Sequence, residues 1–328
     1  MVPSRPAVWK GLRLRLNGVG SRLHFGDRVL ELSRFETNHL RSVRTRIRRA
    51  SGALLTWRSV LSNPYVAGKL QPLMAEDDYA VLMRPALPER DGELPTPPPE
   101  MWERWSDTLE NYLETGRVDM DRMLRILAGV GVSHESQVRV LDFGCAEGRM
   151  LRFFPRRAES ELWGVDINAE RIAWAQQHLP PPFRVLTTTT APHLPFSDAY
   201  FDLIYCHSVF THISDLADAW FLELLRILRR GGHIYLTIHD EHTVELLLGR
   251  YRDTNAHVSA AVQHLEEQTD VLSKEWIYVA ILADPGANVF YNAKSLVDKW
   301  SRFAECLEIR PEAAEYQTAV VFRKPMQQ

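Results

Sequence analysis

Two carboxylates and a glycine-rich turn are the groups in this chain best suited to hold a ligand. Asp142 ends an apolar run of strand character, and a turn from Gly144 to Gly148 follows it. Asp166 ends a second run of this kind. In nucleotide-binding βαβ units, an acidic residue about 20 residues after the glycine turn accepts hydrogen bonds from ribose hydroxyls. The two acids and the turn therefore predict a site for a nucleoside-type ligand, whereas either acid alone would suit a solvated strand end.

The turn departs from the G-x-G-x-x-G fingerprint of dinucleotide-binding proteins. Ala146 stands at the second glycine position and Arg149 at the third. The methyl group of Ala146 is small, so close approach of the backbone to a ligand is still expected. Asp142, two positions before the first glycine, suits an ammonium group better than a pyrophosphate. The pattern thus favours a ligand with both a ribose and an ammonium group.

Three stretches of the chain carry a family resemblance. The run VRVLDFGCAEG at 138–148 resembles the first motif of class I S-adenosylmethionine-dependent methyltransferases. FDLIYCHSVFTHI at 201–213, preceded by LPF at 194–196, is similar to the fourth-strand region of bacterial members that carry an S-V-F-T-H segment. LRILRRGGHIYLT at 225–237 resembles the helix, glycine turn and fifth strand of the same family. The resemblance covers about residues 135–328 and implies S-adenosylmethionine as the cofactor.

The resemblance also assigns roles to individual positions. The acid at the position of Asp166 holds both ribose hydroxyls, and the adenine lies between Ile167 and the turn at Thr190 and Ala191. Many relatives have an Asp or Asn about where this chain has Thr190, whose hydroxyl could accept the same hydrogen bond. The cofactor-binding residues implied in this way are Asp142, Gly144, Cys145, Ala146, Gly148, Asp166, Ile167, Thr190, Ala191 and His207.

Histidines after two predicted strands are candidates for acid–base chemistry. Methyl transfer depends mainly on alignment, and a base is needed only for a hydroxyl or a protonated amine. His239 is the strongest candidate, because Asp240 and Glu241 follow it and a carboxylate can orient an imidazole. His207 is the second, and a structural hydrogen bond is the alternative role for each. The pair His239 and His242 lacks i, i+4 spacing, so no metal site is expected.

Alternation of strands and helices predicts an α/β fold: a Rossmann-like, seven-stranded methyltransferase sheet with an N-terminal helical extension. The expected parts are a basic helical region (1–84), a proline-rich linker (85–99), a helical cap (100–134) and the methyltransferase domain (135–328) with a helical lid insert at about 240–290. Expected strands are 138–143, 161–166, 183–187, 201–206, 233–238, 306–309 and 318–322. Expected helices include one that starts at Arg149 directly after the glycine turn, one after Asn168 as N-cap, one at 215–229 capped by Ser214 and ended by Gly231 and Gly232, and one at 293–303.

Charge and composition limit the classes of partner. Residues 1–60 contain thirteen Lys or Arg, several of them between Arg41 and Arg49, against three acids. This stretch could contact nucleic acid, form a dimer interface or a lid, or be a solvated helix face. Three widely spaced cysteines, no apolar run long enough to span a membrane and no signal-peptide pattern predict a cytoplasmic protein.

The leading functional hypothesis is O-methylation of a small molecule or of a sugar hydroxyl in a glycan. The aromatic and histidine residues of the insert suit such an acceptor, although a plain helical cap would also account for them. Two alternatives remain: an RNA methyltransferase that uses the basic N-terminal arm, and a cofactor-binding scaffold without catalysis. The sequence leaves the acceptor atom and the oligomeric state open.

Overall fold

The computed structural model describes residues 14–16, 21–25, 28–32, 93–102, 108–133, 135, 139–253, 256–269, 278–283 and 286–326. The chain divides into two compact units, residues 1–62 and 63–328. Arg41–Arg49 and residues 85–92 of the expected linker lie outside the described residues. Within them, no helix is both long and apolar enough to cross a membrane.

In the first unit, an antiparallel three-stranded sheet corrects the helical expectation for residues 14–32. Its strands are β1 (Leu14–Leu16), β2 (Ser21–Phe25) and β3 (Arg28–Leu32), in the order β1-β2-β3. The helical prediction rested on the basic composition of this stretch. Apolar and polar residues nevertheless alternate over short runs within it, as in LRL at 14–16. A period of two is the pattern of a strand rather than of a helix.

The second unit is built on a seven-stranded sheet in the order β11-β12-β8-β7-β4-β5-β6. Strands β4 to β8 run parallel, and β12 and β11 close the edge as an antiparallel hairpin. The order reverses at β4, so its carboxyl end lies at the switch point where open α/β sheets bind ligands. The predicted Rossmann-like fold is confirmed. The strands are β4 (Arg139–Phe143), β5 (Glu161–Asp166), β6 (Phe183–Thr187), β7 (Phe201–Cys206), β8 (Leu228–Ile238), β11 (Glu305–Ala314) and β12 (Gln317–Arg323).

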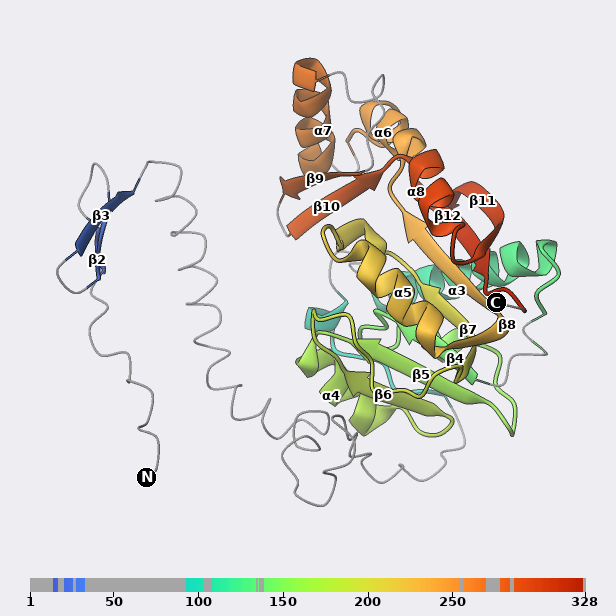
Figure 1. The fold of residues 1–328 in the computed structure, drawn as a ribbon. Coiled ribbons are helices and arrows are strands. Elements are labelled where there is room, and N and C mark those ends of the chain that lie inside the picture. The colour runs from blue at the N-terminus through green and yellow to red at the C-terminus, as the bar shows by residue number, and fades with distance from the viewer. Residues whose placement is uncertain are drawn as a thin grey trace, which may run out of the picture. The chain divides into compact units, whose positions relative to one another are not determined.

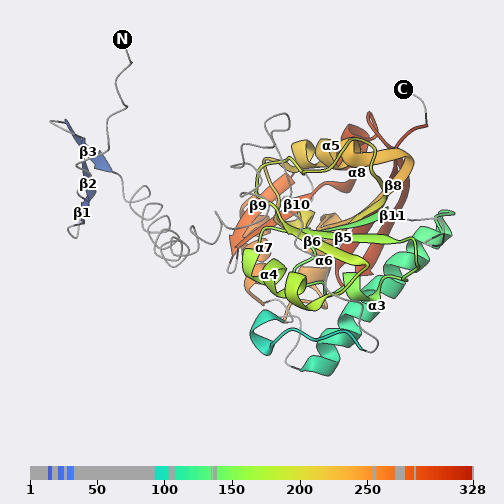
Figure 2. The ribbon, with the colours of Figure 1, turned by 90° about the horizontal axis from the view of Figure 1, so that it is seen from below.

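Helices cover both faces of this sheet (Figure 2). On one face lie α5 (Ala217–Ile227) and α8 (Ala293–Trp300), and on the other lie α3 (Leu109–Gly129) and α4 (Ala169–His178). Strand residues alternate between the two cores: Ile204 packs into the core below α5 and α8, and Leu203 into the other. Both faces of the parallel strands are therefore buried, as the apolar runs predicted.

Both ends of α5 and the end of α8 differ from the prediction. Leu216, not Ser214, occupies the N-cap position, and β8 begins at Leu228 directly after the helix. The glycine pair lies inside β8, because Gly231 donates to the carbonyl of Lys324 and Gly232 accepts from its N–H, each at 2.9 Å. These bonds to the chain after β12 draw the pair into the sheet. The following helix, α8, ends at Trp300 rather than at 303.

The helix expected directly after the glycine turn is only a 3-10 turn, η5 (Leu151–Phe153). Pro155 explains this, because the residue before a proline is driven out of the helical region and Phe154 is extended at φ −62° and ψ 134°. Helix α3 packs there instead: a Cβ on Gly116 would lie 2.6 Å from the carbonyl oxygen of Arg149. The expected helix from residue 100 is a 3-10 turn, η2 (Pro99–Met101), followed by α3 with Thr108 as N-cap.

The insert between β8 and α8 is only partly helical. It contains α6 (Glu241–Leu248), α7 (Ala256–Thr269) and a hairpin of β9 (Tyr278–Ala283) and β10 (Gly286–Tyr291), which the sequence did not predict. These elements gather at the carboxyl end of β8 (Figure 1). A separate small core, with Val258 of α7 and Phe290 of β10, holds them together. His239 and Phe290 form an isolated bridge, which fixes the hairpin against the end of the main sheet.

Candidate active site

The glycine turn is locked between the two central strands. The N–H groups of Gly144 and Cys145 both donate to the carbonyl of Val165, at 2.8 and 3.1 Å. Gly144 has φ +89°, and a Cβ there would lie 2.2 Å from Cγ2 of Val209. The loop after β7 thus packs directly on the turn, and no side chain fits between them. Cys145 is buried, and its sulfur occupies the space beside Gly164 where a Cβ would otherwise lie.

Asp166 lies at the carboxyl end of β5, facing this turn. One carboxylate oxygen accepts from the N–H of Ala146 at 2.9 Å, and the other from the N–H of Asn168 at 2.7 Å. Each carboxylate oxygen can accept a further hydrogen bond. Asn168 also caps α4, as predicted. The neighbouring Ile167 is 62% exposed, which is unusual for a large apolar residue and leaves an open apolar surface beside the carboxylate.

Asp142 is buried at the end of β4. Its carboxylate accepts a 2.9 Å hydrogen bond from the phenol of Tyr205 on β7. Burial raises the pKa of Asp142 to about 8, although the bond from Tyr205 favours the ionised form. A carboxyl group in this state gains from a cationic partner, which would restore its charge.

The loop after β6 contributes a residue that the sequence analysis missed. Thr188 is buried, its N–H donates to the carbonyl of Asp166 at 2.8 Å, and its hydroxyl has no hydrogen-bond partner within the described part of the chain. Thr190 and Ala191, the predicted adenine contacts, are exposed in the same loop. A buried hydroxyl without a partner beside an exposed loop is what a polar ligand would satisfy.

Buried charges behind the turn form a second feature that the sequence did not reveal. Glu147 pairs with Arg171 of α4 at 2.9 Å and also accepts a hydrogen bond from the phenol of Tyr112 on α3. Arg149 pairs with Asp119 of α3, likewise at 2.9 Å. These contacts tie the turn to two helices. In the sequence, these contacts are indicated only by two charged residues, Glu147 and Arg149, within or directly after the glycine turn.

His207 follows β7 and faces α3. Its side chain is 6% exposed, and Nε2 lies 3.8 Å from Oδ2 of Asp119. Burial lowers the pKa of His207 to about 4, while the nearby charge of Asp119 opposes this shift. The imidazole is therefore neutral at neutral pH.

His239 is buried directly after β8 and packs against two aromatic rings. The ring centres of Phe290 and Tyr316 are 5.0 and 5.6 Å from its own. Neither ring nitrogen has a hydrogen-bond partner among the described residues, and burial lowers the pKa to about 3. The two carboxylates expected to orient the ring are engaged elsewhere: Asp240 caps α6, and Glu241 accepts from the N–H of Ala293 at 2.9 Å.

Comparison with known proteins identifies this architecture. The family described as "Methyltransferase domain" matches residues 141–236, which include the glycine turn, Asp166 and the whole of β7. Residues 141–236 are thus similar to a methyltransferase domain.

Relatives of known sequence or structure are distant. A malonyl-[acyl-carrier protein] O-methyltransferase from Salmonella typhimurium is 26% identical over 175 residues, which are 53% of this chain and 65% of the relative, so the match spans less than two thirds of its length. A SAM-dependent methyltransferase from Aquifex aeolicus is 14% identical with a TM-score of 0.44, over 69% of this chain and 98% of that one. A 1,6-didemethyltoxoflavin-N1-methyltransferase from Burkholderia thailandensis is 14% identical with a TM-score of 0.42, over 71% and 93%. The strand order, not these similarities, carries the fold assignment.

The cofactor of the methyltransferase domain is S-adenosylmethionine, and the residues present fit it. The carboxylate oxygens of Asp166 can each accept a further hydrogen bond from a ribose hydroxyl, and the buried hydroxyl of Thr188 has no partner among the described residues. Asp142 suits the ammonium group. The structure thus gathers most of the predicted cofactor residues around the carboxyl ends of β4, β5 and β6, while their individual roles stay predictions.

His242 is not gathered with them. Its Nε2 lies 3.1 Å from Glu312 and its Nδ1 3.6 Å from Glu245 of the same helix. Within the described residues, no group of three or more His, Cys, Asp or Glu side chains could hold a metal ion. His207 and His239 therefore stay the two predicted candidates for acid–base chemistry.

Proposed function

We propose that this protein methylates a hydroxyl oxygen of a small molecule or of a glycan sugar, with His239 as the general base. The observation that carries the proposal is the pair of ring nitrogens of His239, both buried and without partners in the described structure. Leaving a buried polar group unsatisfied costs about 1–3 kcal/mol, which favours a ligand that bonds to it.

The surroundings of His239 suit an acceptor with a flat or weakly polar ring face. Phe290 and Tyr316 flank the imidazole, and Tyr251 lies against Tyr316 with ring centres 5.6 Å apart. Aromatic faces pack against phenol rings and against the C–H faces of sugars. These residues belong to the insert and to the turn between β11 and β12, which fits the predicted role of the insert as a lid.

His239 also lies close to the elements that border the cofactor site. The 3-10 turn η6 (Phe210–His212) follows the loop that packs on Gly144. The phenol of Tyr291 on β10 donates to the carbonyl of Phe210 at 3.2 Å, and the N–H of Tyr291 donates to the carbonyl of His239 at 2.8 Å. One residue thus joins His239 to the border of the cofactor site.

The chemistry follows from these positions. When bound, S-adenosylmethionine supplies a methyl group activated by a positively charged sulfur. His239 is neutral at neutral pH, so a ring nitrogen carries a lone pair that can accept the proton of the acceptor hydroxyl as its oxygen takes the methyl group. The positive charge gained by the imidazole equals the one lost by the methyl donor, so the net charge of the site is unchanged. The aromatic rings exclude water from the reacting atoms.

Transfer of a labelled methyl group tests this proposal. The full chain would be incubated with methyl-labelled cofactor and a panel of phenols, sugars, primary amines and a malonyl acyl carrier protein. The last is included because the Salmonella relative is named for an O-methylation. His239→Gln should lower kcat about 100-fold or more on the hydroxyl acceptor, with cofactor affinity unchanged.

His233→Gln is the matched control. His233 lies in the middle of β8, opposite Arg323 of β12 in the sheet, and, like His239, has a pKa lowered mainly by burial. The control should retain activity. Equal turnover by wild type and His239→Gln would contradict the role of His239, and transfer to amines alone would contradict O-methylation. Cofactor binding without transfer to any acceptor of this panel, or to RNA added as a further acceptor, would favour the scaffold alternative.

A further inference from the structure

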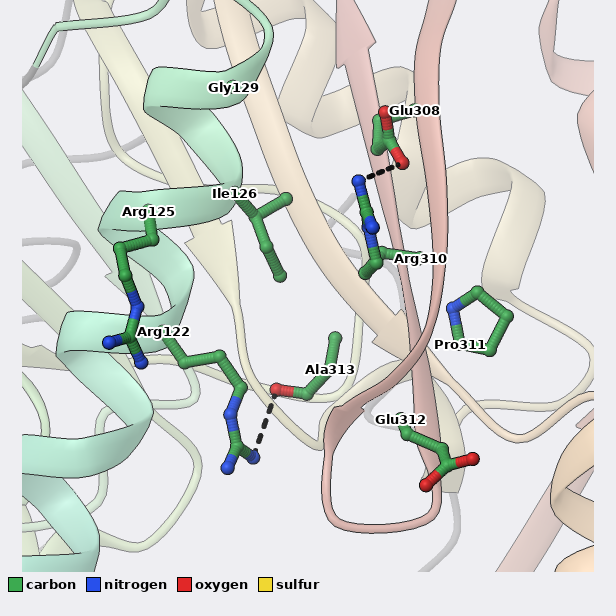
Figure 3. Close-up of a pocket in the computed structure, with 9 residues that line it drawn as sticks. All are labelled: Arg122, Arg125, Ile126, Gly129, Glu308, Arg310, Pro311, Glu312 and Ala313. Atoms are coloured by element: carbon green, nitrogen blue, oxygen red, sulfur yellow. Dashed lines mark hydrogen bonds and ion pairs between the residues drawn. The ribbon is translucent and has the colours of Figure 1, made fainter.

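A charged groove lies between the last turns of α3 and the strand β11 (Figure 3). Its volume of about 340 Å³ falls in the range of small-molecule pockets. Arg122 extends from α3 across the groove toward Ala313, and Arg125 lies on the same helix. The remaining lining residues are Ile126, Gly129, Glu308, Arg310, Pro311 and Glu312.

The carboxylates of the groove are already paired with cations. Glu308 accepts from Arg310 at 2.9 Å, and Glu312 pairs with Arg250 and with His242. Among the described residues, Arg122 donates a single long bond of 3.4 Å, to the carbonyl of Ala313.

Two guanidinium groups therefore remain as surplus positive charge. In the part of the chain that the structure describes, neither Arg122 nor Arg125 forms an ion pair. The carboxyl-terminal dipole of α3 opposes an anion here, but it amounts to about half a charge against two full charges. The net positive charge of the groove therefore favours a bound anion.

We propose that this groove binds a phosphate group carried by the methyl acceptor, so that the substrate is a phosphorylated small molecule such as a sugar phosphate. This inference rests on the function proposed above. Guanidinium groups form paired, charge-assisted hydrogen bonds with phosphate oxygens. Arg122, half-buried, supplies the inner contact, and the exposed Arg125 supplies the contact at the rim.

The turn between β11 and β12 links the groove to the acceptor pocket. Ala313 faces the groove and binds Arg122, whereas Tyr316, three residues further on, packs on His239. Thr243 of α6 anchors this turn by donating to the carbonyl of Tyr316 at 2.7 Å. An acceptor with its phosphate against Arg122 and its hydroxyl near His239 would contact both sides of one short turn.

Calorimetric titration of the full chain with inorganic pyrophosphate, without cofactor, tests the groove independently of methyl transfer. Wild type should bind with an affinity that weakens as salt is added. Arg122→Gln/Arg125→Gln should lose about tenfold or more in affinity. Arg117→Gln on the same helix is the control, because Arg117 pairs with Glu114 and does not line the groove. Its affinity should stay within about twofold of wild type.

Arginine side-chain NMR signals of the wild type provide a second readout that needs no variant. The Nε–H signals of Arg122 and Arg125 should shift on addition of pyrophosphate, and that of Arg117 should not. Absence of pyrophosphate binding, or shifts confined to other arginines, would contradict the proposal that this groove binds phosphate. That conclusion would hold even if labelled methyl transfer succeeds.

Competition against pyrophosphate identifies the phosphate source. Glucose 1-phosphate should displace pyrophosphate and glucose should not. Displacement by a short single-stranded RNA at far lower concentration than by glucose 1-phosphate would overturn the small-acceptor assignment.

Discussion

Tyr205 on β7 donates a hydrogen bond of 2.9 Å to Asp142 on β4, and both side chains are buried beneath the glycine turn. Burial raises the pKa of Asp142 from an ordinary value of 3.8 to about 8. The folded protein therefore holds a proton here that the unfolded chain releases at neutral pH. The stabilising effect of this proton is complete below pH 3.8 and is lost as the pH rises toward 8.

We predict that Asp142→Asn stabilises the cofactor-free protein in alkaline solution. The amide stays neutral and can still accept the bond from Tyr205, so it avoids the cost of a buried charge. The rise in melting temperature relative to wild type should grow between about pH 5 and pH 8 and then level off. Thermal unfolding at a series of pH values measures this. A difference that shrinks as the pH rises would contradict it.

The same substitution should weaken binding of S-adenosylmethionine. A cationic ammonium beside Asp142 favours the carboxylate, so the wild type should release a proton on binding near pH 7. Calorimetry in buffers with different heats of ionisation would detect the released proton. Asp142→Asn should bind at least about tenfold more weakly, with less proton release. Equal proton release by both proteins would place its source elsewhere.

The parts of the fold that the sequence predicted depend on local patterns. The strands 161–166, 183–187 and 201–206 match the structure because each is a short apolar run with clear ends. The turn residues predict a helix that starts at Arg149, but Pro155 limits it to the single 3-10 turn η5. The β9–β10 hairpin was missed because the insert had been interpreted as helical throughout.

The parts of the site that were missed depend on distant contacts. Nothing near Glu147 in the sequence shows that Arg171 and Tyr112 lie against it, because those residues come from two separate helices. In the same way, Asp240 was expected to orient His239, but a capping box at the start of α6 uses its side chain. Spacing predicts which strand end a residue occupies, not which neighbour it bonds.

Asp166→Asn should lower cofactor affinity by about tenfold or more, because the amide loses the negative charge that strengthens bonds from hydroxyl donors. The substitution is isosteric and leaves an oxygen that can still accept one of the two backbone bonds, so the turn should stay folded. Calorimetric titration with S-adenosylmethionine and S-adenosylhomocysteine measures the loss. Asp298→Asn is the control, since Asp298 pairs with Lys294 on the exposed surface of α8, away from the glycine turn. Comparable losses of affinity in both variants would contradict the prediction that Asp166 binds the cofactor.

Glu147→Gln should lower the free energy of unfolding by about 3 kcal/mol, because it removes the negative charge that pairs with the buried guanidinium of Arg171. The amide oxygen can still accept the bond from Tyr112, so most of the loss comes from Arg171. Urea unfolding followed by tryptophan fluorescence measures this value. Glu147→Gln/Arg171→Met should recover part of the loss, because it removes both buried charges. A double variant no more stable than the single one would show that the isolated charge is not the cause.

Gly144→Ala should destabilise the protein and abolish tight cofactor binding for two separable reasons. The new Cβ would lie 2.2 Å from Cγ2 of Val209, and φ +89° is strained for any residue with a Cβ. Gly144→Ala/Val209→Ala removes the clash but keeps the strain, which costs about 1–2 kcal/mol, so it should recover only part of the stability. Gly129→Ala is the control: a Cβ there meets nothing within 4 Å at the end of α3, and no loss is expected. Thermal unfolding with and without S-adenosylmethionine compares the variants, and full recovery in the double variant would show that packing against Val209, not the backbone conformation, requires glycine at this position.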